Sequence, residues 1–191
     1  MFSYRRPTQS EIDRFLIGAE NQKFSYSEIG TTAGLIPTGY TVDRNRTRLG
    51  SGAESFRNAK QSLEAWKMFE LGWVHLFPLN TPIQIDETVA LVVRHFGFWS
   101  LNACRIVYVI KEERQFGFAY GTLEQHAEQG EERFSVEWDF NDDSVFYNIL
   151  AFSKPRQWQA KTARPLSRLL QKRFARDSMA AMRANAPPQR V

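Results

Sequence analysis

The sequence has one cysteine, three histidines and no long apolar run. Cys104 alone cannot form an internal disulfide or a zinc site, and a single unpaired cysteine fits a reducing cytosol. No run approaches the roughly 18 apolar residues that a membrane-spanning helix needs. No hydrophobic stretch follows Arg5 and Arg6, as it would in a secretory signal. We therefore expect a cytoplasmic protein without a transmembrane segment.

The chain is 191 residues long, with 42% hydrophobic and 24% charged residues. This length suits one domain, and these fractions are too close to average for an intrinsically disordered chain. The 15 Phe, 6 Tyr and 5 Trp residues supply bulky groups for a core or for the lining of an apolar pocket. We expect a single domain over residues 1–185, in which residues 1–38 form a helix and a connector, and a flexible tail over 186–191.

Positive charge is concentrated in the last part of the chain. Residues 154–191 contain ten Lys or Arg residues and one acidic residue, Asp177, whereas the whole chain has a net charge of +4. Such a segment could bind nucleic acid or an anionic membrane surface. It could equally pack on the acidic remainder of the chain or form the solvated face of a helix, which is the usual state of such charges. We favour the second interpretation and do not expect a nucleic-acid partner.

Two capping-box patterns predict helix starts. Thr8–Glu11 places a hydroxyl three residues before a carboxylate, and Ser51–Glu54 repeats this spacing. The apolar periodicity that follows predicts helices over 9–20 and from 51 to about 72, where a glycine supplies a stop. A strand is predicted between them, over 40–49, because its charged residues alternate.

From residue 73 onward the apolar residues repeat at every second position, which predicts half-buried strands. Short turns separate several of these strands, and short connections imply antiparallel neighbours. A last helix is predicted over 163–182, with Pro165 in its first turn, where a helix tolerates proline. The predicted strands cover 73–78, 87–96, 103–111, 115–122, 132–139 and 144–153.

The order of the predicted elements is helix, strand, helix, six strands and a long last helix. Seven antiparallel strands and one long helix bury their apolar surfaces only if the sheet curls around the helix. This order resembles the helix-grip fold of the START-like (SRPBCC) and birch-pollen-allergen superfamily, to which the helix over 9–20 is an addition. The resemblance implies an α+β fold in which a curved seven-stranded antiparallel sheet grips a long C-terminal helix, often with a cavity between them.

Six runs of the sequence form a distinctive set: RLGSG at 48–52, WKMFELGW at 66–73, NACRIVYV at 102–109, FAYGTL at 118–123, His126 with GEERF at 130–134, and RFARDS at 173–178. The set resembles the uncharacterised protein family UPF0548, whose domain is named DUF1990. The resemblance covers roughly residues 25–185. It implies membership of a family of unknown function and supplies no activity to carry over.

The strongest physical anomaly is an acidic residue on the apolar face of the last helix. At 100° per residue, Asp177 lies at the centre of that face. The face also carries Leu166, Leu170, Phe174 and Ala181. A buried carboxylate is costly unless it is paired or its pKa rises. Asp177 could form a structural salt bridge with Arg173 or with an arginine of the sheet, or it could anchor a polar ligand head or act as a catalytic acid.

Arginines are a second group of candidates. Arg44, Arg46 and Arg48 project from one face of the first predicted strand, and on an outward face they are ordinary solvated charges. If the distal end of the strand turns inward, Arg46 or Arg48 could hold a carboxylate or phosphate through two hydrogen bonds. Arg105, on a later strand, is a further candidate and could pair with Asp177.

The turn between two of the predicted strands carries a third group. His126, with Glu128, Glu131 and Glu132 after it, could bind a metal, but zinc needs at least three well-placed ligands, so we expect no metal. His126 could instead be a pH-tunable acid–base group, with Tyr120 as another candidate for that chemistry. A capped surface turn is the default interpretation.

Small and bulky residues alternate along the strand predicted over 115–122. Gly117, Ala119 and Gly121 share one face, and bulky residues that include Phe118 and Tyr120 share the other. Small residues in a strand mark a bend or the close approach of another element. We expect these positions to let the sheet curl or to admit a neighbouring segment.

Three classes of function stay open. The first is a binding protein whose cavity takes a small apolar or amphipathic molecule, since apolar walls with a few polar groups describe most pockets. The second is an enzyme of the cyclase, isomerase or hydrolase type, with Asp177, Tyr120 or His126 as acid–base groups. The third is a polyanion or membrane-surface binder that uses the basic C-terminal segment. We rank them in this order and expect no cofactor. The candidate ligand-binding residues are Arg46, Arg48, Arg105, Tyr120 and Asp177.

Overall fold

The structure is a computed structural model that describes residues 2–126, 128–155 and 164–186. Within these residues the chain forms three α-helices, eight strands and two short 3-10 helices, η1 (Thr31–Ala33) and η2 (Lys67–Phe69). The α-helices are α1 (Gln9–Ala19), α2 (Gly52–Glu64) and α4 (Arg164–Asn185). The strands are β1 (Phe2–Ser3), β2 (Thr41–Ser51), β3 (Val74–Phe77), β4 (Thr88–His95), β5 (Phe98–Lys111), β6 (Gln115–Thr122), β7 (Glu128–Trp138) and β8 (Ser144–Pro155).

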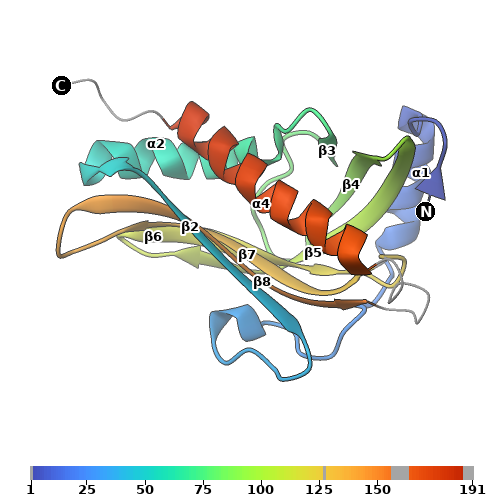
Figure 1. The fold of residues 1–191 in the computed structure, drawn as a ribbon, viewed down its shortest axis with the longest axis horizontal. Coiled ribbons are helices and arrows are strands. Elements are labelled where there is room, and N and C mark those ends of the chain that lie inside the picture. The colour runs from blue at the N-terminus through green and yellow to red at the C-terminus, as the bar shows by residue number, and fades with distance from the viewer. Residues whose placement is uncertain (1, 127, 156–163, 187–191) are drawn as a thin grey trace.

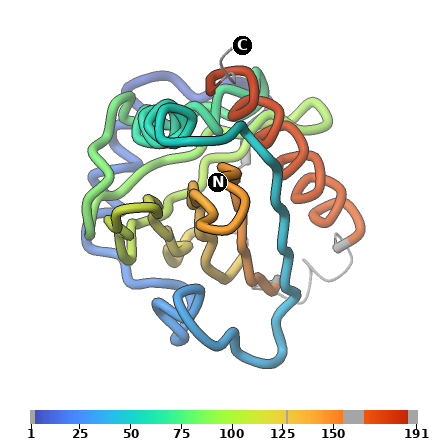
Figure 2. Tube along the Cα trace, turned by 90° about the vertical axis from the view of Figure 1, so that its left-hand side faces the viewer, coloured from blue at the N-terminus to red at the C-terminus, as the bar shows by residue number. Residues whose placement is uncertain are grey.

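The described strands form one antiparallel sheet in the order β2-β8-β7-β6-β5-β4-β3, and the two-residue β1 pairs with β5. In Figure 1 this sheet curves beneath α4 and α2. Figure 2 looks along α2 and shows α4 crossing beside β2. The predicted α+β fold, a curved seven-stranded antiparallel sheet with a long C-terminal helix and an extra N-terminal helix, is confirmed. We call the side of the sheet that faces α2 and α4 the inner face, and the opposite side the outer face.

Strand alternation sorts side chains between the two faces. On β6, Phe116, Phe118 and Tyr120 are buried on the inner face. Helix α4 contributes Ala175 and Met182 to the same cluster. The inner face and the two helices above it therefore enclose the main core.

Aromatic rings fill much of the layer between the inner face and α4. The ring centre of Phe69, in η2, lies 5.7 Å from that of Phe134 on β7 and 5.4 Å from that of Phe174 on α4. Tyr120 lies 5.4 Å from Phe134 in an edge-on arrangement. Such contacts stabilise a core beyond simple burial of area, so this layer holds sheet, η2 and helix together.

The outer face is covered by α1 and by the connector, residues 20–40. Ile12 of α1 is buried against Ala90, Val92 and Leu101 of β4 and β5. The connector runs beneath the sheet in Figure 1, on the side opposite α4. The two faces are thus covered by different parts of the chain.

A buried carboxylate on β7 fixes the connector to the outer face. Glu131 is 2% exposed and accepts hydrogen bonds from the Tyr26 hydroxyl at 2.7 Å, the Gly30 N–H at 2.7 Å and the Thr32 N–H at 3.0 Å. The Thr32 hydroxyl also contacts this carboxylate. Buried charge persists where hydrogen bonds satisfy it, so these donors account for an acidic residue at this position.

Of the two predicted capping boxes, one is present. Thr8 and Glu11 exchange the two expected hydrogen bonds at the start of α1. The prediction for Ser51 is wrong, because its side chain makes no capping hydrogen bond. Ser51 is the last residue of β2 and pairs with Ser144, and the next N–H, that of Gly52, donates to the Asp143 carbonyl at 2.9 Å.

Helix α2 ends at Glu64 rather than near residue 72. Trp66 takes a left-handed backbone conformation, with φ at 55°, and a 3-10 turn follows it. Its indole N–H donates to the Thr81 carbonyl at 2.7 Å, and its side chain is 4% exposed. The helix therefore ends where this ring is buried, and the glycine at position 72 does not indicate that position.

Strands β5 and β7 begin earlier than predicted, at Phe98 and Glu128. The added residues pair with β4 and β8, respectively. No helix in the described residues is long and apolar enough to cross a membrane. Of the predicted tail, residues 187–191 lie outside the described residues.

Candidate functional site

The inner face carries a hydrogen-bonded polar pair within its aromatic layer. The Tyr120 hydroxyl donates to the Glu132 carboxylate, with 3.0 Å between the oxygens. The two residues are direct neighbours across β6 and β7. Glu132 shares one side of β7 with the buried Phe134 and Val136, so alternation turns a carboxylate into the layer beneath α4. We call Tyr120 and Glu132 the inner polar pair.

The environment of Glu132 favours its neutral form. Burial raises the pKa of Glu132 to about 7, and the Asp43 carboxylate adds to this shift, while the hydrogen bond from Tyr120 opposes it. Asp43 lies in the same row of the sheet, because Glu132 pairs with Ala151 and Ala151 pairs with Asp43. Burial also raises the pKa of Tyr120, so its hydroxyl keeps its proton. Glu132 can therefore exchange a proton near neutral pH.

A second polar contact joins α4 to the same layer. The Tyr147 and Ser178 hydroxyls lie 2.9 Å apart, and both residues are fully buried. Burial raises the pKa of Tyr147, and so does the charge of Glu132. Ser178 is thus the polar residue that α4 turns into the core, between the buried Ala175 and Met182.

Charged and polar contacts hold the first half of α4 over the sheet edge. The Arg168 guanidinium donates to both carboxylate oxygens of Asp43, at 2.5 and 2.7 Å. The Ser167 hydroxyl donates to Glu128 at 2.5 Å. The basic last segment therefore packs in part on acidic residues of β2 and β7.

Asp177 lies beside the aromatic layer, with its own partners. Its carboxylate accepts hydrogen bonds from the Trp73 indole N–H at 3.0 Å, from Arg176 at 2.9 Å and from Arg173 at 3.4 Å. Its side chain is 25% exposed. Burial alone would raise the pKa of Asp177, but the hydrogen bonds from Arg176 and Trp73 outweigh it and leave the pKa lowered. These are the contacts of an ionised carboxylate in an ion pair.

The structure places Arg46 and Arg48 on the outer side of β2, exposed to solvent. The Arg46 guanidinium lies 3.6 Å from the centre of the Phe146 ring. The residues that alternate with these arginines, including Asp43 and Thr47, contact α4 instead. Arg46 and Arg48 are therefore not brought together with the inner polar pair.

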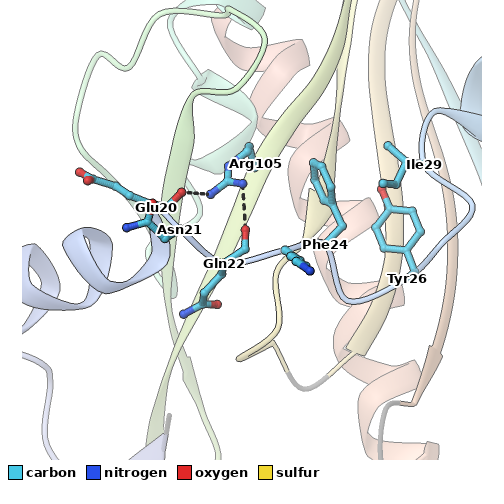
Figure 3. A pocket seen from close by; sticks show the side chains of 8 residues that line it. Glu20, Asn21, Gln22, Phe24, Tyr26, Ile29 and Arg105 are labelled. Atoms are coloured by element: carbon cyan, nitrogen blue, oxygen red, sulfur yellow. Dashed lines mark hydrogen bonds between the residues drawn. The ribbon is translucent and has the colours of Figure 1, made fainter.

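Arg105 lies on the outer face of β5, where its side chain caps the C-terminal end of α1. Its guanidinium donates to the main-chain oxygens of Ala19, Glu20 and Gln22 at 2.8–2.9 Å. Figure 3 shows it at the edge of a hollow between this helix end and the connector. Its neighbour Ile106 points to the inner face, so the sheet itself separates Arg105 from the inner polar pair.

His126 lies in the turn between β6 and β7, where the Glu128 N–H donates to its Nδ1 at 3.0 Å. Burial lowers the pKa of His126 to about 4, so the ring is neutral at pH 7. Glu131 and Glu132, which follow it in the sequence, point to opposite faces of β7. In the described parts of the chain, no three His, Cys, Asp or Glu side chains gather as a metal ion would require.

Two residues of the inner layer carry no distinguishing signal in the sequence. Glu132 begins the strand predicted over 132–139, where its spacing from Phe134 and Val136 indicates the same side of that strand, but its closeness to His126 in the sequence groups it with the carboxylates of the turn. The apolar periodicity of the last helix points to Asp177, one residue before Ser178, as the centre of the buried face. Neither residue type is unusual, so only the register of its element distinguishes it.

Solved structures with the same arrangement share little sequence with this chain. A hypothetical protein from Helicobacter pylori gives a TM-score of 0.55 at 13% identity, over 76% of this chain and 88% of that one. The di-domain ARO/CYC protein StfQ from the steffimycin biosynthetic pathway gives 0.53 at 8%, over 77% and 51%. Ara h 8.0201 gives 0.50 at 8%, over 78% and 98%. The likeness shows the fold alone, and that fold is the helix grip.

Sequence relatives identify the family. Residues 25–181 match the family described as a domain of unknown function, DUF1990. A UPF0548 protein from Dictyostelium discoideum is 34% identical over 93% of this chain and 92% of its own length. Another, from Deinococcus radiodurans, is 35% identical over 92% and 94%. The chain belongs to the UPF0548 (DUF1990) family.

Proposed function

We propose that the chain binds a small amphipathic molecule between the inner face and α4, with the polar head of the ligand on the inner polar pair. The observation that carries this proposal is a hydrogen-bonded, protonatable pair within a layer otherwise built mainly from aromatic and aliphatic groups. Small-molecule sites combine apolar walls with a few polar groups that fix orientation. The fold supports the proposal by analogy only.

The inner polar pair favours an uncharged head group. A protonated Glu132 donates to a carbonyl or hydroxyl oxygen, and an ionised one accepts from a hydroxyl or an amide. The Tyr120 hydroxyl can do either. A permanently anionic head is disfavoured, because the ionised form of Glu132 would repel it, as the charge of Asp43 already disfavours that ionised form. The apolar body of the ligand would lie among rings such as Phe134 and Phe174.

Binding requires side chains to move, because Phe69, Phe134 and Phe174 already occupy the layer. The first half of α4 is the segment that we expect to move when a ligand binds. Leu166 and Leu169 there are 41% and 57% exposed, so this part of the helix buries less apolar surface than the turns around Met182. We therefore expect a ligand to shift α4 and these rings together.

Methionine methyl groups provide a direct test. Met68 and Met182 are fully buried in this layer and Met179 packs against it, and the chain has four methionines in all. A titration of methyl-labelled protein with 1-dodecanol, followed by NMR, is expected to shift all three signals. Unshifted signals at saturating dodecanol would contradict the proposal.

A matched pair of variants connects that shift to the head-group site. Glu132→Leu removes the hydrogen-bonding group and is expected to weaken dodecanol binding about 10-fold, the effect of one lost hydrogen bond. Glu113→Leu, on an exposed turn, is expected to bind as the unchanged protein does. Equal affinities for the two variants would show that the inner polar pair does not hold the ligand.

A second candidate function is acid–base catalysis in the same layer. A carboxyl with a pKa of about 7, hydrogen-bonded to a phenol, suits proton transfer at neutral pH. Glu132 would move the proton and Tyr120 would hold the carbonyl oxygen. Deuterium exchange at the carbons beside the carbonyl of 2-undecanone, followed by NMR, tests this. Exchange lost in Glu132→Gln supports an enzyme, and exchange no faster than in buffer contradicts it.

Polyanion binding through the basic segment stays in third place. Arg168 is paired with Asp43, and both Arg173 and Arg176 with Asp177, so two carboxylates offset two of these three positive charges. Binding to a polyanion would weaken steeply with salt. A salt-sensitive retention on heparin, lost when Lys172 and Arg183, which are exposed on α4, are changed to Ser, would raise this candidate above the others.

A further inference from the structure

A hollow of about 530 Å³ opens on the outer face, between the C-terminal end of α1 and the connector (Figure 3). Small-molecule sites have volumes of roughly 300–1,000 Å³, so the hollow is large enough for one. The functions proposed above do not use it. Its lining residues are Glu20, Asn21, Gln22, Lys23, Phe24, Tyr26, Ile29 and Arg105.

The aromatic wall of the hollow is held by the sheet beneath it. The ring centres of Phe24 and Tyr26 are 5.9 Å apart, and Figure 3 shows the two side chains next to each other. Both approach Gly121 of β6, where an added Cβ would lie 2.2 Å from the Tyr26 hydroxyl oxygen. Tyr26 also donates to the buried Glu131 at 2.7 Å. This wall therefore exists before any ligand arrives.

The hollow has a cation whose hydrogen bonds go to neutral oxygens. The Arg105 guanidinium lies 5.9 Å from the centre of the Phe24 ring. Among the described residues its hydrogen-bond acceptors are the Thr88 hydroxyl and three main-chain oxygens, and it has no ion pair with a carboxylate. Lys23 adds a second, exposed cation, and the Glu20 carboxylate offsets one of the two charges.

We propose that this hollow binds a flat aromatic monoanion, an aryl carboxylate, with its ring against Phe24 and its carboxylate toward Arg105 and Lys23. Offset or edge-on ring contacts suit an aromatic ligand beside Phe24 and Tyr26. A partly buried guanidinium attracts an anion more strongly than a fully solvated one, because water screens it less. One net positive charge matches a monoanion better than a polyanion. The site is separate from the inner layer, which lies on the other face of the sheet.

The probe for this site is 2-naphthoate, with the neutral 2-naphthamide as its matched analogue. We expect naphthoate to bind with a dissociation constant below about 1 mM and naphthamide to bind about 10-fold more weakly, the effect of one lost charge-assisted contact. Phe24→Leu and Lys23→Ala should each weaken naphthoate binding about 3-fold or more. Lys111→Ala, which removes a cation from a separate hollow beside Phe116, is the control and should change nothing.

Amide and methionine signals in NMR locate the bound probe. Binding on the outer face shifts amides of residues 22–29 and leaves the Met68 and Met182 methyl signals in place. Equal binding of naphthoate and naphthamide, or no effect of either Phe24→Leu or Lys23→Ala, would overturn the proposal. Methionine shifts without amide shifts in the connector would also overturn it, and would instead support a ligand in the inner layer.

Discussion

Among single residues, Glu132 is the one whose protonation we expect to change the stability of the fold. It accepts a hydrogen bond from Tyr120 at 3.0 Å, and burial disfavours its charged form. A carboxyl that prefers to be neutral in the folded chain ionises freely in the unfolded chain. Folding stability must then depend on pH through this one group.

Stability is expected to fall as pH rises from about 4.5 to about 7. The pKa of Glu132 is about 7 in the folded chain against 4.5 as its ordinary value, so the folded state binds the extra proton in this window. The free energy of unfolding should drop by up to about 3 kcal/mol across it, relative to Glu132→Gln. Urea unfolding of both proteins at several pH values measures this difference. Parallel pH profiles for the two would contradict the assignment, and Glu113→Gln provides the control on an exposed turn.

Asp177 is expected to contribute to stability through its partners. Asp177→Ala leaves the Trp73 indole N–H, largely buried, without its acceptor and should cost about 1–2 kcal/mol. Asp177→Asn keeps an acceptor oxygen and should cost less. Denaturant midpoints of the two variants check this order. Two variants as stable as the unchanged protein would remove the structural account of this residue.

The residue scale also limits what the sequence predicts. A helical wheel identified an apolar face on the last helix, but it placed Asp177 at the centre, where the structure has Ser178. Leu166 and Leu169 are exposed, so the apolar residues of this helix do not all mark one buried stripe. One residue is 100° on a helix, and the packing of α4 against η2, α2 and the sheet fixes that rotation.

At the scale of elements, the packing of the connector on β6 requires a glycine at position 121. Gly121→Ala would push a Cβ into Tyr26 and Phe24 and is expected to cost about 2 kcal/mol. Gly18→Ala, on the exposed side of α1 with no atom within 4 Å, should instead stabilise by about 0.5 kcal/mol. Thermal unfolding of the two variants distinguishes them. A neutral Gly121→Ala would mean that the connector does not lie against this strand.

The connector is expected to open when its anchor is removed. Glu131→Ala leaves the Tyr26 hydroxyl and the N–H groups of Gly30 and Thr32 unpaired, at a cost of about 3 kcal/mol. Hydrogen exchange over residues 25–38 should accelerate. Glu137→Ala, on the same side of β7 but away from the connector, should leave this exchange unchanged. Acceleration in both variants would point to general loosening of β7.

Elements with a regular alternation were predictable, and those set by distant contacts were not. The alternation over 115–122 gave β6 as it stands, and the small-residue side of that strand does receive another segment at Gly121. The sequence does not indicate the first residues of β7, because Glu128 and Glu131 have the pattern of a solvated turn. Their carboxylates are in fact used by Ser167 of α4 and by the connector, partners 39 and about 100 residues away.

At the scale of the whole molecule, the sheet separates two kinds of surface. Its inner face holds an aromatic layer and one protonatable pair under α4, and its outer face holds an open hollow with a guanidinium that donates to neutral oxygens. The order of elements is enough to predict a curved sheet that grips the last helix, because few folds bury seven antiparallel strands and one long helix. The sequence could not predict how far rings fill the layer, since that depends on how three elements pack at once.

Native and denaturing mass spectrometry of freshly purified protein test the central claim most directly. A ligand of the inner layer predicts an extra mass on the native chain that disappears on denaturation and is reduced in the Glu132→Leu variant. Its formula should describe an apolar body with an uncharged polar head. A native mass equal to that of the bare chain, or an extra mass that Glu132→Leu retains in full, would contradict binding at the inner polar pair.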